Sequence, residues 1–345
     1  MPASTHANEF CREILPQVSR TFALSIRLLP GDLGTAVRCA YLVCRIADTI
    51  EDEPTMEATD KAPLFDSLAA SFESESAAAA FTAEAARLTG DAACVRLVRN
   101  SDLVFASYRA LPERTRGFVR HWVTEMITGM RKFVLAYPRG VRIQSLDEYK
   151  EYCYYVAGTV GYLLTDLWHE HSPSISDERY QALKARSRAF AEALQTVNIL
   201  KDVARDAEHE NSIYVPEQLL QAHGSAHATI LSSDRAQQNG AALDALIQLA
   251  WKDLDEAKAY LLTIPRRAVS IRLFCALPLL FAYATLRDLT RRPGALMRRE
   301  VVKISRGEVK SLTVLSMLGV LSNRAMARLV ERARTKRLVI WLAKS

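Results

Sequence analysis

The chain has 345 residues, of which 13 are Gly and 12 are Pro; 49% of its residues are hydrophobic and 24% are charged. This composition excludes collagen and low-complexity disorder, and the scarcity of turn residues argues against β sandwiches and barrels, which need a turn every ~8–12 positions. The net charge of +6 is mild, but residues 287–345 hold 15 Lys and Arg against 4 Asp and Glu. We expect an all-α protein whose basic C-terminal part suits an anionic partner, such as a nucleic acid, a phosphorylated ligand or a membrane surface.

Apolar residues recur at helical spacing along most of the chain. The segment between Pro16 and Pro30 leaves helix and extended strand open, and residues 71–93 are rich in Ala and Glu. A capping pattern at Ser145 and Glu148 opens one helix, and residues 174–215 are expected to form two helices joined near Asp177. The helices expected from spacing, Pro and Gly cover residues 35–53, 115–136, 145–168, 239–262, 269–290 and 311–341.

Cysteine usage and the chain's first residues bear on the compartment. The six cysteines form no Cys-x-x-Cys pair and several lie in apolar helical patterns, which predicts reduced core thiols and a cytosolic location. Residues 1–10 lack the basic and apolar regions of a signal peptide. The longest nearly apolar run, residues 273–286, is shorter than the ~20 residues that span a bilayer. We expect a cytoplasmic protein, soluble or peripheral at a membrane, with no transmembrane segment.

Two acidic stripes carry the strongest chemical signal. Asp48 and Asp52 are four residues apart, and Asn198, Asp202 and Asp206 repeat this spacing far along the chain. Residues four apart share one helix face, where like charges destabilise the helix by a few tenths of a kcal/mol. One such pair is more often a solvated face, but two pairs in apolar segments free of Gly and Pro indicate a bound cation.

A common cavity would turn the two stripes into an all-oxygen ligand set, which Mg²⁺ prefers and shares with substrate phosphates. Basic residues lie nearby: Arg45 precedes Asp48 by three positions, Lys201 directly precedes Asp202, and Arg20 follows Ser19. Each basic residue alone is most often part of a surface salt bridge. Together they suit an anion that metal bridges and Arg and Lys clamp.

The segment 152–161 (YCYYVAGTVG) places Gly158 and Gly161 inside a helical pattern, where each costs about 1 kcal/mol relative to Ala. Close helix packing is the simpler explanation, and a nearby ligand is the other. Acidic stripes, basic residues, aromatics and apolar helices together describe a site for a diphosphate with a long apolar tail. Metal would help the diphosphate leave, and aromatic rings would stabilise the resulting carbocation.

These segments resemble the signatures of the squalene/phytoene synthases, which join two prenyl diphosphates head to head. The first signature is Ser19-Arg20-Thr21-Phe22 with residues 41–52, the central one is 152–161, and the second aspartate signature is 198–206 followed by 213–216 (IYVP). The resemblance covers residues 10–310. It implies a single-domain class I isoprenoid synthase fold over residues 1–345, with two aspartate-rich helices facing each other across a central cavity. Beyond the resemblance, spacing and charge predict a basic C-terminal helix over 311–345.

The resemblance also implies a role for each matched residue. Mg²⁺ and diphosphate would be held by Asp48, Asp52, Asn198, Asp202 and Asp206, with Asn198 as a further ligand or cofactor contact. Diphosphate would also meet Ser19, Arg20, Tyr41, Arg45 and Lys201, and the cavity would be lined by Phe22, Tyr155 and Phe274. Tyr155 is in addition a candidate for stabilising the carbocation or removing a proton.

Three products fit the resemblance. Squalene forms from two farnesyl diphosphates through presqualene diphosphate with a hydride from NADPH, whereas phytoene and dehydrosqualene end by proton loss. Residues 274–278 (FCALP) and 302–307 (VKISRG) resemble squalene synthase segments near the nicotinamide, where Lys303 matches a basic position and Arg306 is offset by one. No Gly-x-Gly-x-x-Gly motif exists, so NADPH would meet a basic surface. We expect a squalene synthase, with phytoene or dehydrosqualene synthase as the alternative.

Two positions depart from the family pattern. Asn211 stands where the family usually has Arg, so one phosphate contact is missing or comes from His209 or a neighbour. Leu279 follows Pro278 where squalene synthases often carry a polar residue. Both departures weaken the squalene assignment more than the family assignment.

Other classes explain less of the sequence. A helical protein that binds nucleic acid through its basic C-terminus leaves both acidic stripes unexplained, so no nucleic-acid partner is expected. Enzymes of head-to-tail prenyl elongation carry pairs of adjacent aspartates, whereas Thr49 and Glu51 occupy the positions next to the aspartates of this chain. Several basic residues precede the apolar positions 338–342: Arg328, Arg332, Arg334, Lys336 and Arg337. This pattern suits either peripheral contact with an anionic membrane or a packed helix with one solvent-exposed face. A monomer is favoured, and the oligomeric state is left open.

Overall fold

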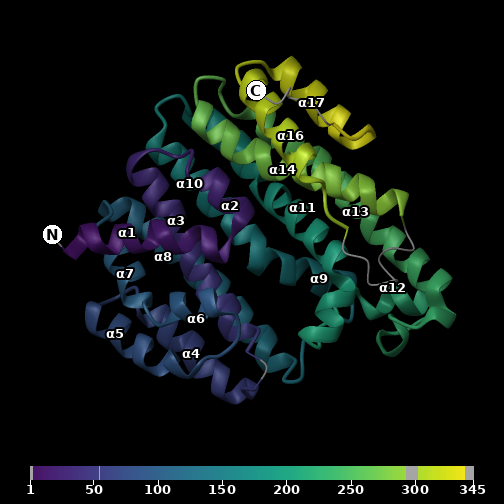
Figure 1. The fold of residues 1–345 in the computed structure, drawn as a ribbon, viewed down its shortest axis with the longest axis horizontal. Coiled ribbons are helices and arrows are strands. Elements are labelled where there is room, and N and C mark those ends of the chain that lie inside the picture. The colour runs from purple at the N-terminus through teal and green to yellow at the C-terminus, as the bar shows by residue number, and fades with distance from the viewer. Residues whose placement is uncertain (1–2, 54, 293–301, 339–345) are drawn as a thin grey trace. The chain divides into compact units, whose positions relative to one another are not determined.

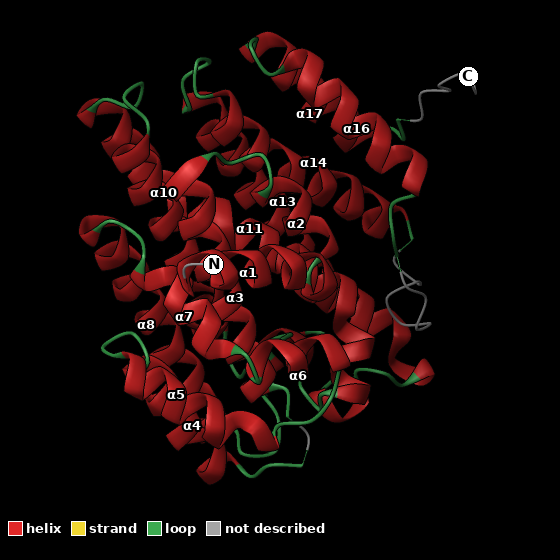
Figure 2. Cartoon of the chain, turned by 60° about the vertical axis from the view of Figure 1, so that its left-hand side comes forward, coloured by secondary structure: helices red, strands yellow, loops and turns green. Residues whose placement is uncertain are grey.

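The computed structural model describes residues 3–53, 55–292 and 302–338, and within these ranges every regular element is a helix (Figures 1 and 2). The only pairing of strand type among them is one isolated bridge between Arg142 and Ile213. The predicted all-α class is confirmed. Contacts divide the chain into two compact units, one comprising Met1–Val141 and Tyr155–His171, the other Arg142–Tyr154 and Ser172–Ser345. The single domain stays a prediction, and each unit is described by itself.

The first unit is built around α3 (Gly31–Glu51), whose apolar side chains Leu42, Val43 and Ile46 are fully buried. This helix contacts α1, α4, α6, α7 and α8, so its position is set from several sides. The other elements of the unit are α1 (Ala3–Val18), α2 (Arg20–Ile26), α4 (Ala58–Ala70), α5 (Glu75–Glu84), η1 (Ala85–Arg87), α6 (Ala92–Val98), α7 (Ser101–Arg109), α8 (Glu113–Ala136) and α10 (Thr159–His171).

The second unit is dominated by α11 (Asp177–His209), which packs along α13 (Ala236–Thr263) (Figure 1). The remaining elements are α9 (Leu146–Cys153), α12 (Glu217–Ala222), η3 (His227–Thr229), η4 (Ser233–Arg235), α14 (Val269–Arg291), α16 (Arg306–Gly319) and α17 (Asn323–Thr335). A single π-helical turn, η2 (Tyr154–Gly158), follows α9 and precedes α10.

Among the described residues, α14 is the one helix long and apolar enough to cross a membrane, but 89% of its apolar window is buried inside the protein. Its buried Arg272 donates to the carbonyls of Val320 and Ile264, and its buried Arg287 pairs with Glu308 at 2.9 Å. Buried charges with protein partners suit a core helix of a folded unit.

Most expected helices are confirmed, and two expectations are wrong. The helix expected over 145–168 is confirmed: it begins under the Ser145 cap and continues to His171, with the π turn η2 inside it, which apolar spacing does not distinguish from an α turn. Residues 174–215 contain one helix, since Ser176 caps α11 just before Asp177. The single helix over 311–341 is two helices, because α16 ends at Gly319 and Ser322 caps α17; residues 339–345 lie outside the described residues.

Two further features concern the segment after Pro16, whose structure the sequence leaves open, and the state of the cysteines. The segment after Pro16 is helical, because the Ser19 side chain accepts a hydrogen bond from the Phe22 N–H and starts α2. All six cysteines are free, and five of them are buried, as expected for core thiols.

We predict opposite effects on stability for two Gly-to-Ala substitutions. A Cβ at Gly34 would lie 2.3 Å from the Leu29 carbonyl oxygen, so Gly34→Ala should lower the free energy of unfolding by about 1–3 kcal/mol. A Cβ at Gly117 in α8 would meet nothing within 4 Å, so Gly117→Ala should raise it by about 0.5–1 kcal/mol. Urea unfolding followed by circular dichroism measures both, and equal midpoints for the two variants would contradict this account.

Candidate active site

The first acidic stripe lies on α3. Tyr41, Arg45, Asp48 and Asp52 follow one another at intervals of four, three and four residues, so they share one face of the helix. Asp52 is the C-cap of α3, and its backbone N–H donates to the Asp48 carbonyl at 2.8 Å. The last turns of α3 therefore carry both carboxylates of this stripe.

Contacts gather five of the predicted residues at this stripe. Arg45 Nη1 lies 3.3 Å from Asp48 Oδ2, and each of these side chains is 34% exposed. The Phe22 ring centre is 5.5 Å from that of Tyr41. Burial raises the pKa of Tyr41 to about 12, and a hydrogen bond with Ser19 opposes this effect. Arg20 is the first residue of α2, directly after Ser19.

Asp48 is crowded by protein although a third of its side chain is accessible to solvent. This desolvation raises the pKa of Asp48, and the charge and hydrogen bond of Arg45 partly offset it. A carboxylate in such surroundings gains from a cation that stays with it.

The second acidic stripe lies on α11. Asn198 is exposed, Asp202 is partly exposed and Asp206 is 9% exposed. Lys201 Nζ lies 3.1 Å from Asp202 Oδ2, so this stripe, like the first, pairs one of its aspartates with a basic neighbour in sequence.

The two stripes have the same place on their helices. Asp48 and Asp52 lie at the C-terminal end of α3, and Asp202 and Asp206 lie in the last turns of α11. A helix C-terminus carries partial negative charge, so a carboxylate in the last turn, such as that of Asp48 or Asp206, is unfavourable by about 0.3–1 kcal/mol unless a cation compensates.

The donor set can be tested against Mg²⁺. Within the described part of the chain, no three His, Cys, Asp or Glu side chains converge to hold a metal ion. Each stripe thus offers oxygen ligands from at most two carboxylates. Mg²⁺ is usually bound in this way, by one or two carboxylates together with water and substrate phosphates, so the residues of each stripe fit this ion.

Arg142 lies beside Asn211, the position where the family usually has Arg. Asn211 follows the C-cap of α11 with φ of 47°, and the N–H of Ser212 donates to the Asp206 carbonyl at 2.9 Å. The Arg142 guanidinium donates to the backbone carbonyl of Asn211 and, at 2.6 Å, to its side-chain oxygen. Sequence reasoning missed Arg142, because it lies far from α11 along the chain and only the bridge with Ile213 brings it there.

Tyr155 lies in η2, against α8. A Cβ at Gly129 would lie 2.0 Å from the Tyr155 ring, so only Gly at this position leaves room for it. The Phe133 ring meets Tyr155 edge-on at 6.5 Å, and Lys132 Nζ lies 6.0 Å from the Tyr155 ring centre. Single π turns occur frequently at functional sites. Spacing alone did not single out Gly129.

The other predicted residues lie in the second unit. Phe274 is 3% exposed within α14. Lys303 and Arg306 are exposed, just before and at the start of α16. A helix N-terminus with two cations suits an anionic group, such as a phosphate of NADPH.

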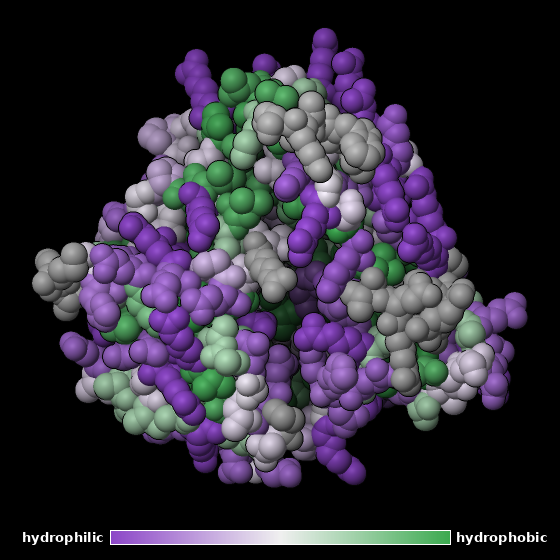
Figure 3. Space-filling model, in the orientation of Figure 1, coloured by the Kyte–Doolittle hydropathy of each residue, from purple (hydrophilic) through white to green (hydrophobic). Residues whose placement is uncertain are grey.

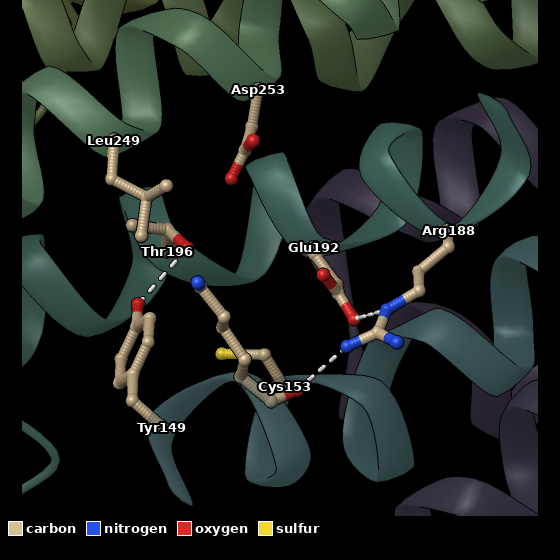
Figure 4. A pocket seen from close by; sticks show the side chains of 8 residues that line it. Tyr149, Cys153, Arg188, Glu192, Thr196, Leu249 and Asp253 are labelled. Atoms are coloured by element: carbon tan, nitrogen blue, oxygen red, sulfur yellow. Dashed lines mark hydrogen bonds and ion pairs between the residues drawn. The ribbon is translucent and has the colours of Figure 1, made fainter. Parts of the chain in front are cut away.

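A cavity of about 290 Å³ opens in the second unit on another face of α11 (Figure 4). The Tyr149 hydroxyl donates to Thr196 at 2.9 Å, and Arg188 donates to Glu192 at 2.6 Å. Burial raises the pKa of Asp253 to about 6, although Lys252 and Lys150 lower it. The sequence reasoning did not identify this cavity, which α9, α11 and α13 line together: Tyr149, Lys150, Cys153, Arg188, Glu192, Thr196, Leu249 and Asp253.

Comparison with solved structures identifies the class of fold. A TcSQS structure with a ligand matches with a TM-score of 0.79 at 21% identity, covering 95% of this chain and 98% of that one. The squalene synthase HpnC from Alicyclobacillus acidocaldarius matches with a TM-score of 0.60 at 20% identity, covering 84% and 95%. The predicted helical isoprenoid synthase fold is confirmed.

Comparison of sequences identifies the family. The pattern of the squalene/phytoene synthases matches residues 15–308, and the chain belongs to this family. It is 27% identical over 309 residues to the squalene synthase of Schizosaccharomyces pombe, covering 89% of this chain and 64% of that protein. Squalene synthase 1 of Arabidopsis thaliana is 25% identical over 300 residues, covering 86% and 68%. The chain thus spans about two thirds of the length of these relatives.

We predict that Asp253 makes stability depend on pH. Its folded-state pKa of about 6 lies above the unfolded value of about 3.9, so the folded state binds the proton more tightly and loses stability as pH rises from about 4 to 6. Asp253→Asn should therefore unfold with a free energy about 1–2 kcal/mol above wild type at pH 7 and near wild type at pH 4. Asp244→Asn, an exposed change on the same helix, is the control. The same Asp253→Asn difference at both pH values would contradict the prediction.

Proposed function

We propose that the chain catalyses the Mg²⁺-dependent head-to-head condensation of two farnesyl diphosphates to squalene, through presqualene diphosphate and with NADPH as reductant. One observation carries the proposal: two acidic stripes at the C-terminal ends of α3 and α11, each with a basic residue bonded to one aspartate. Membership of the squalene/phytoene synthase family supports the reaction class.

The acidic stripes would bind metal. Asp48 and Asp52 on α3, and Asp202 and Asp206 with Asn198 on α11, would hold Mg²⁺. The metal, when bound, neutralises the diphosphate charge that develops as the prenyl group ionises. Carboxylates at helix C-termini gain more from this cation than carboxylates elsewhere on a helix.

Basic and hydroxyl groups would bind the diphosphate. Arg45 and Lys201 already lie beside the metal-binding aspartates, so a metal-bound diphosphate would meet a guanidinium or an ammonium at each stripe. Ser19, Arg20 and Tyr41 would add contacts near the first stripe. Desolvation keeps Tyr41 protonated at neutral pH, so its hydroxyl is a hydrogen-bond donor.

Apolar side chains would surround the prenyl chains. Phe22, Tyr155 and Phe274 are the candidates, and aromatic ring faces stabilise positive charge without reacting with it. The packing of Tyr155 on Gly129 holds its ring in one orientation, which suits either carbocation stabilisation or proton removal.

The reductant separates the proposal from its alternative. NADPH, when bound, supplies a hydride, and the exposed Lys303 and Arg306 with Asn198 would hold it. Phytoene or dehydrosqualene synthesis, the alternative, needs no reductant. A structural neighbour with a TM-score of 0.61 at 20% identity is a dehydrosqualene synthase complex.

Peripheral membrane contact through the basic C-terminus stays a prediction. Hydrophilic side chains run along the upper right edge of the face drawn in Figure 3. Arg328 and Arg332 of α17 are exposed. Met317 and Leu318 in the last turn of α16 and Leu321 in the connection to α17 are exposed, and Leu318 is 80% exposed. Apolar and basic groups together are typical of a surface that contacts anionic lipid in the cytoplasm.

Incubation with farnesyl diphosphate and Mg²⁺, with and without NADPH, tests the reaction. We expect squalene only when NADPH is present. Dehydrosqualene under both conditions would contradict the squalene assignment and support the alternative, and geranylgeranyl diphosphate is assayed in parallel.

Asp48→Asn or Asp202→Asn should lower turnover at least ~100-fold, about 2.7 kcal/mol, with unchanged helical content. Asp244→Asn, exposed on α13, is the charge-matched control. Wild-type turnover in both site variants would refute the metal-site assignment.

Arg142 should replace the family's arginine in diphosphate binding. Arg142→Ala is expected to lower kcat/KM about 10–100-fold, the loss that removal of one charged hydrogen-bond donor produces. Because Arg142 bonds to Asn211, Asn211→Arg in the Arg142→Ala background should restore part of this loss. Arg267→Ala removes the same charge from an exposed position of the second unit as control. Wild-type kinetics in Arg142→Ala would rule out this role.

A further inference from the structure

A cavity of about 520 Å³ lies in the first unit, at the N-terminal end of α3. We propose that this α3 N-terminal pocket binds a small phosphorylated molecule. The pocket is lined by two residues of α1, by the last residue of α2, by the chain between α2 and α3, and by the first two turns of α3: Arg12, Leu15, Ile26, Arg27, Leu29, Gly31, Asp32, Gly34, Thr35 and Arg38.

Arg38 is the strongest reason for an anionic ligand. This arginine is only 8% exposed, and among the described residues no carboxylate lies within ion-pair distance of it. Its Nη2 donates to the side-chain oxygens of Asn8 and Thr35, at 3.3 and 3.1 Å, while its buried Nε has no partner. Burial lowers the pKa of Arg38. A buried cation without a carboxylate partner is unfavourable unless an anion reaches its guanidinium group.

Other buried arginines of this protein have hydrogen-bond or ion-pair partners for their guanidinium groups. Arg272 donates through all three of its guanidinium nitrogens, to Val320, Ile264 and Asn323. Arg287 is buried against the carboxylates of Asp288 and Glu308. Arg45, Arg131 and Arg186 also have a buried Nε without a hydrogen-bond partner, but each is paired with a carboxylate, and among the described residues Arg38 is not.

The backbone of α3 adds a second anion-binding feature. Pro30 is the N-cap and provides no side-chain hydrogen bond to the first turn, whose Gly31 has φ of 52°. The N–H groups of an uncapped first turn and the positive end of the helix dipole both attract anions. Gly34 keeps this turn tight, because a Cβ there would meet the Leu29 carbonyl.

Charge and shape define the ligand class. Three arginines and one aspartate line the pocket, so its lining is net positive, and Arg12 and Arg27 are exposed. Guanidinium groups match phosphate oxygens. Leu15 and Ile26 are buried apolar walls, and the volume exceeds that of a bare phosphate. These features favour a phosphate monoester with a compact apolar group over inorganic phosphate.

The pocket is separate from the acidic stripes. Thr35 and Asp48 are 13 residues apart on α3, or about 20 Å at a rise of 1.5 Å per residue. The inference is therefore independent of the proposed reaction, and its test does not use activity.

Thermal unfolding of the full chain in the presence of a chelator tests the pocket, because without Mg²⁺ the acidic stripes do not attract phosphate. Phenyl phosphate should raise the Tm of the wild type more than inorganic phosphate at the same concentration. Arg12→Ala/Arg27→Ala, which removes exposed side chains, should weaken phenyl phosphate binding at least ~10-fold in calorimetric titration. The control Arg87→Ala/Arg99→Ala removes two exposed charges of the same unit elsewhere and should bind like wild type.

Three results would overturn the proposal. The first is no Tm response of the wild type to either phosphate. The second is an equal response in the wild type, the Arg12→Ala/Arg27→Ala variant and the control, which would be a general ionic effect. The third is no response to soluble phosphates together with binding to phosphatidic acid vesicles that depends on Arg12 and Arg27, which would assign the pocket to a lipid headgroup.

Discussion

The placement of carboxylates at the negative ends of two long helices is the constraint on which the rest of this protein depends. Asp48 and Asp52 close α3, and Asp202 and Asp206 lie in the last turns of α11. Each position adds negative charge where the helix dipole is already negative, so each favours a cation. A basic residue already bonds to one aspartate of each stripe. A divalent ion would add positive charge at the carboxylates and the helix end and would attract a diphosphate.

The same argument gives α3 two functional ends. Its middle is fixed by packing, because Leu42, Val43 and Ile46 are fully buried, and helices on several sides hold it. A rigid helix keeps its dipole aligned, so its ends keep opposite preferences: cations at the Asp48 end, and anions at the Gly31 end, where Arg38 lies buried without a carboxylate. Gly34 is needed for this arrangement, because a Cβ at this position would meet the Leu29 carbonyl. The close approach of that carbonyl sets the tight turn that exposes the first N–H groups of the helix.

Local spacing was enough to predict the helices that carry the chemistry, and contacts between distant segments were not predictable in this way. The three-residue interval placed Arg45 and Asp48 on one face of α3, the resemblance added Tyr41, and the structure brings Arg45 and Asp48 within 3.3 Å. The π turn at Tyr155 and its fit against Gly129 depend on packing between α8 and η2, which leaves no period in the sequence. The count of basic residues in the C-terminal part also overstated the positive charge of its surface, because Arg287 is buried against Asp288 and Glu308.

Asn211 stands where the family usually has Arg, and an arginine from a distant segment of the chain lies beside it. Asn tolerates the left-handed backbone that ends α11, where φ is 47°, better than most residues do. Its side-chain oxygen then accepts a hydrogen bond from Arg142, which brings a guanidinium to the helix end that Asp206 makes negative. A cation there is favoured by the helix dipole whether it comes from the helix itself or from a distant segment. The end of α11 thus favours a positive charge nearby, but the residue that carries this charge can come from a distant part of the sequence.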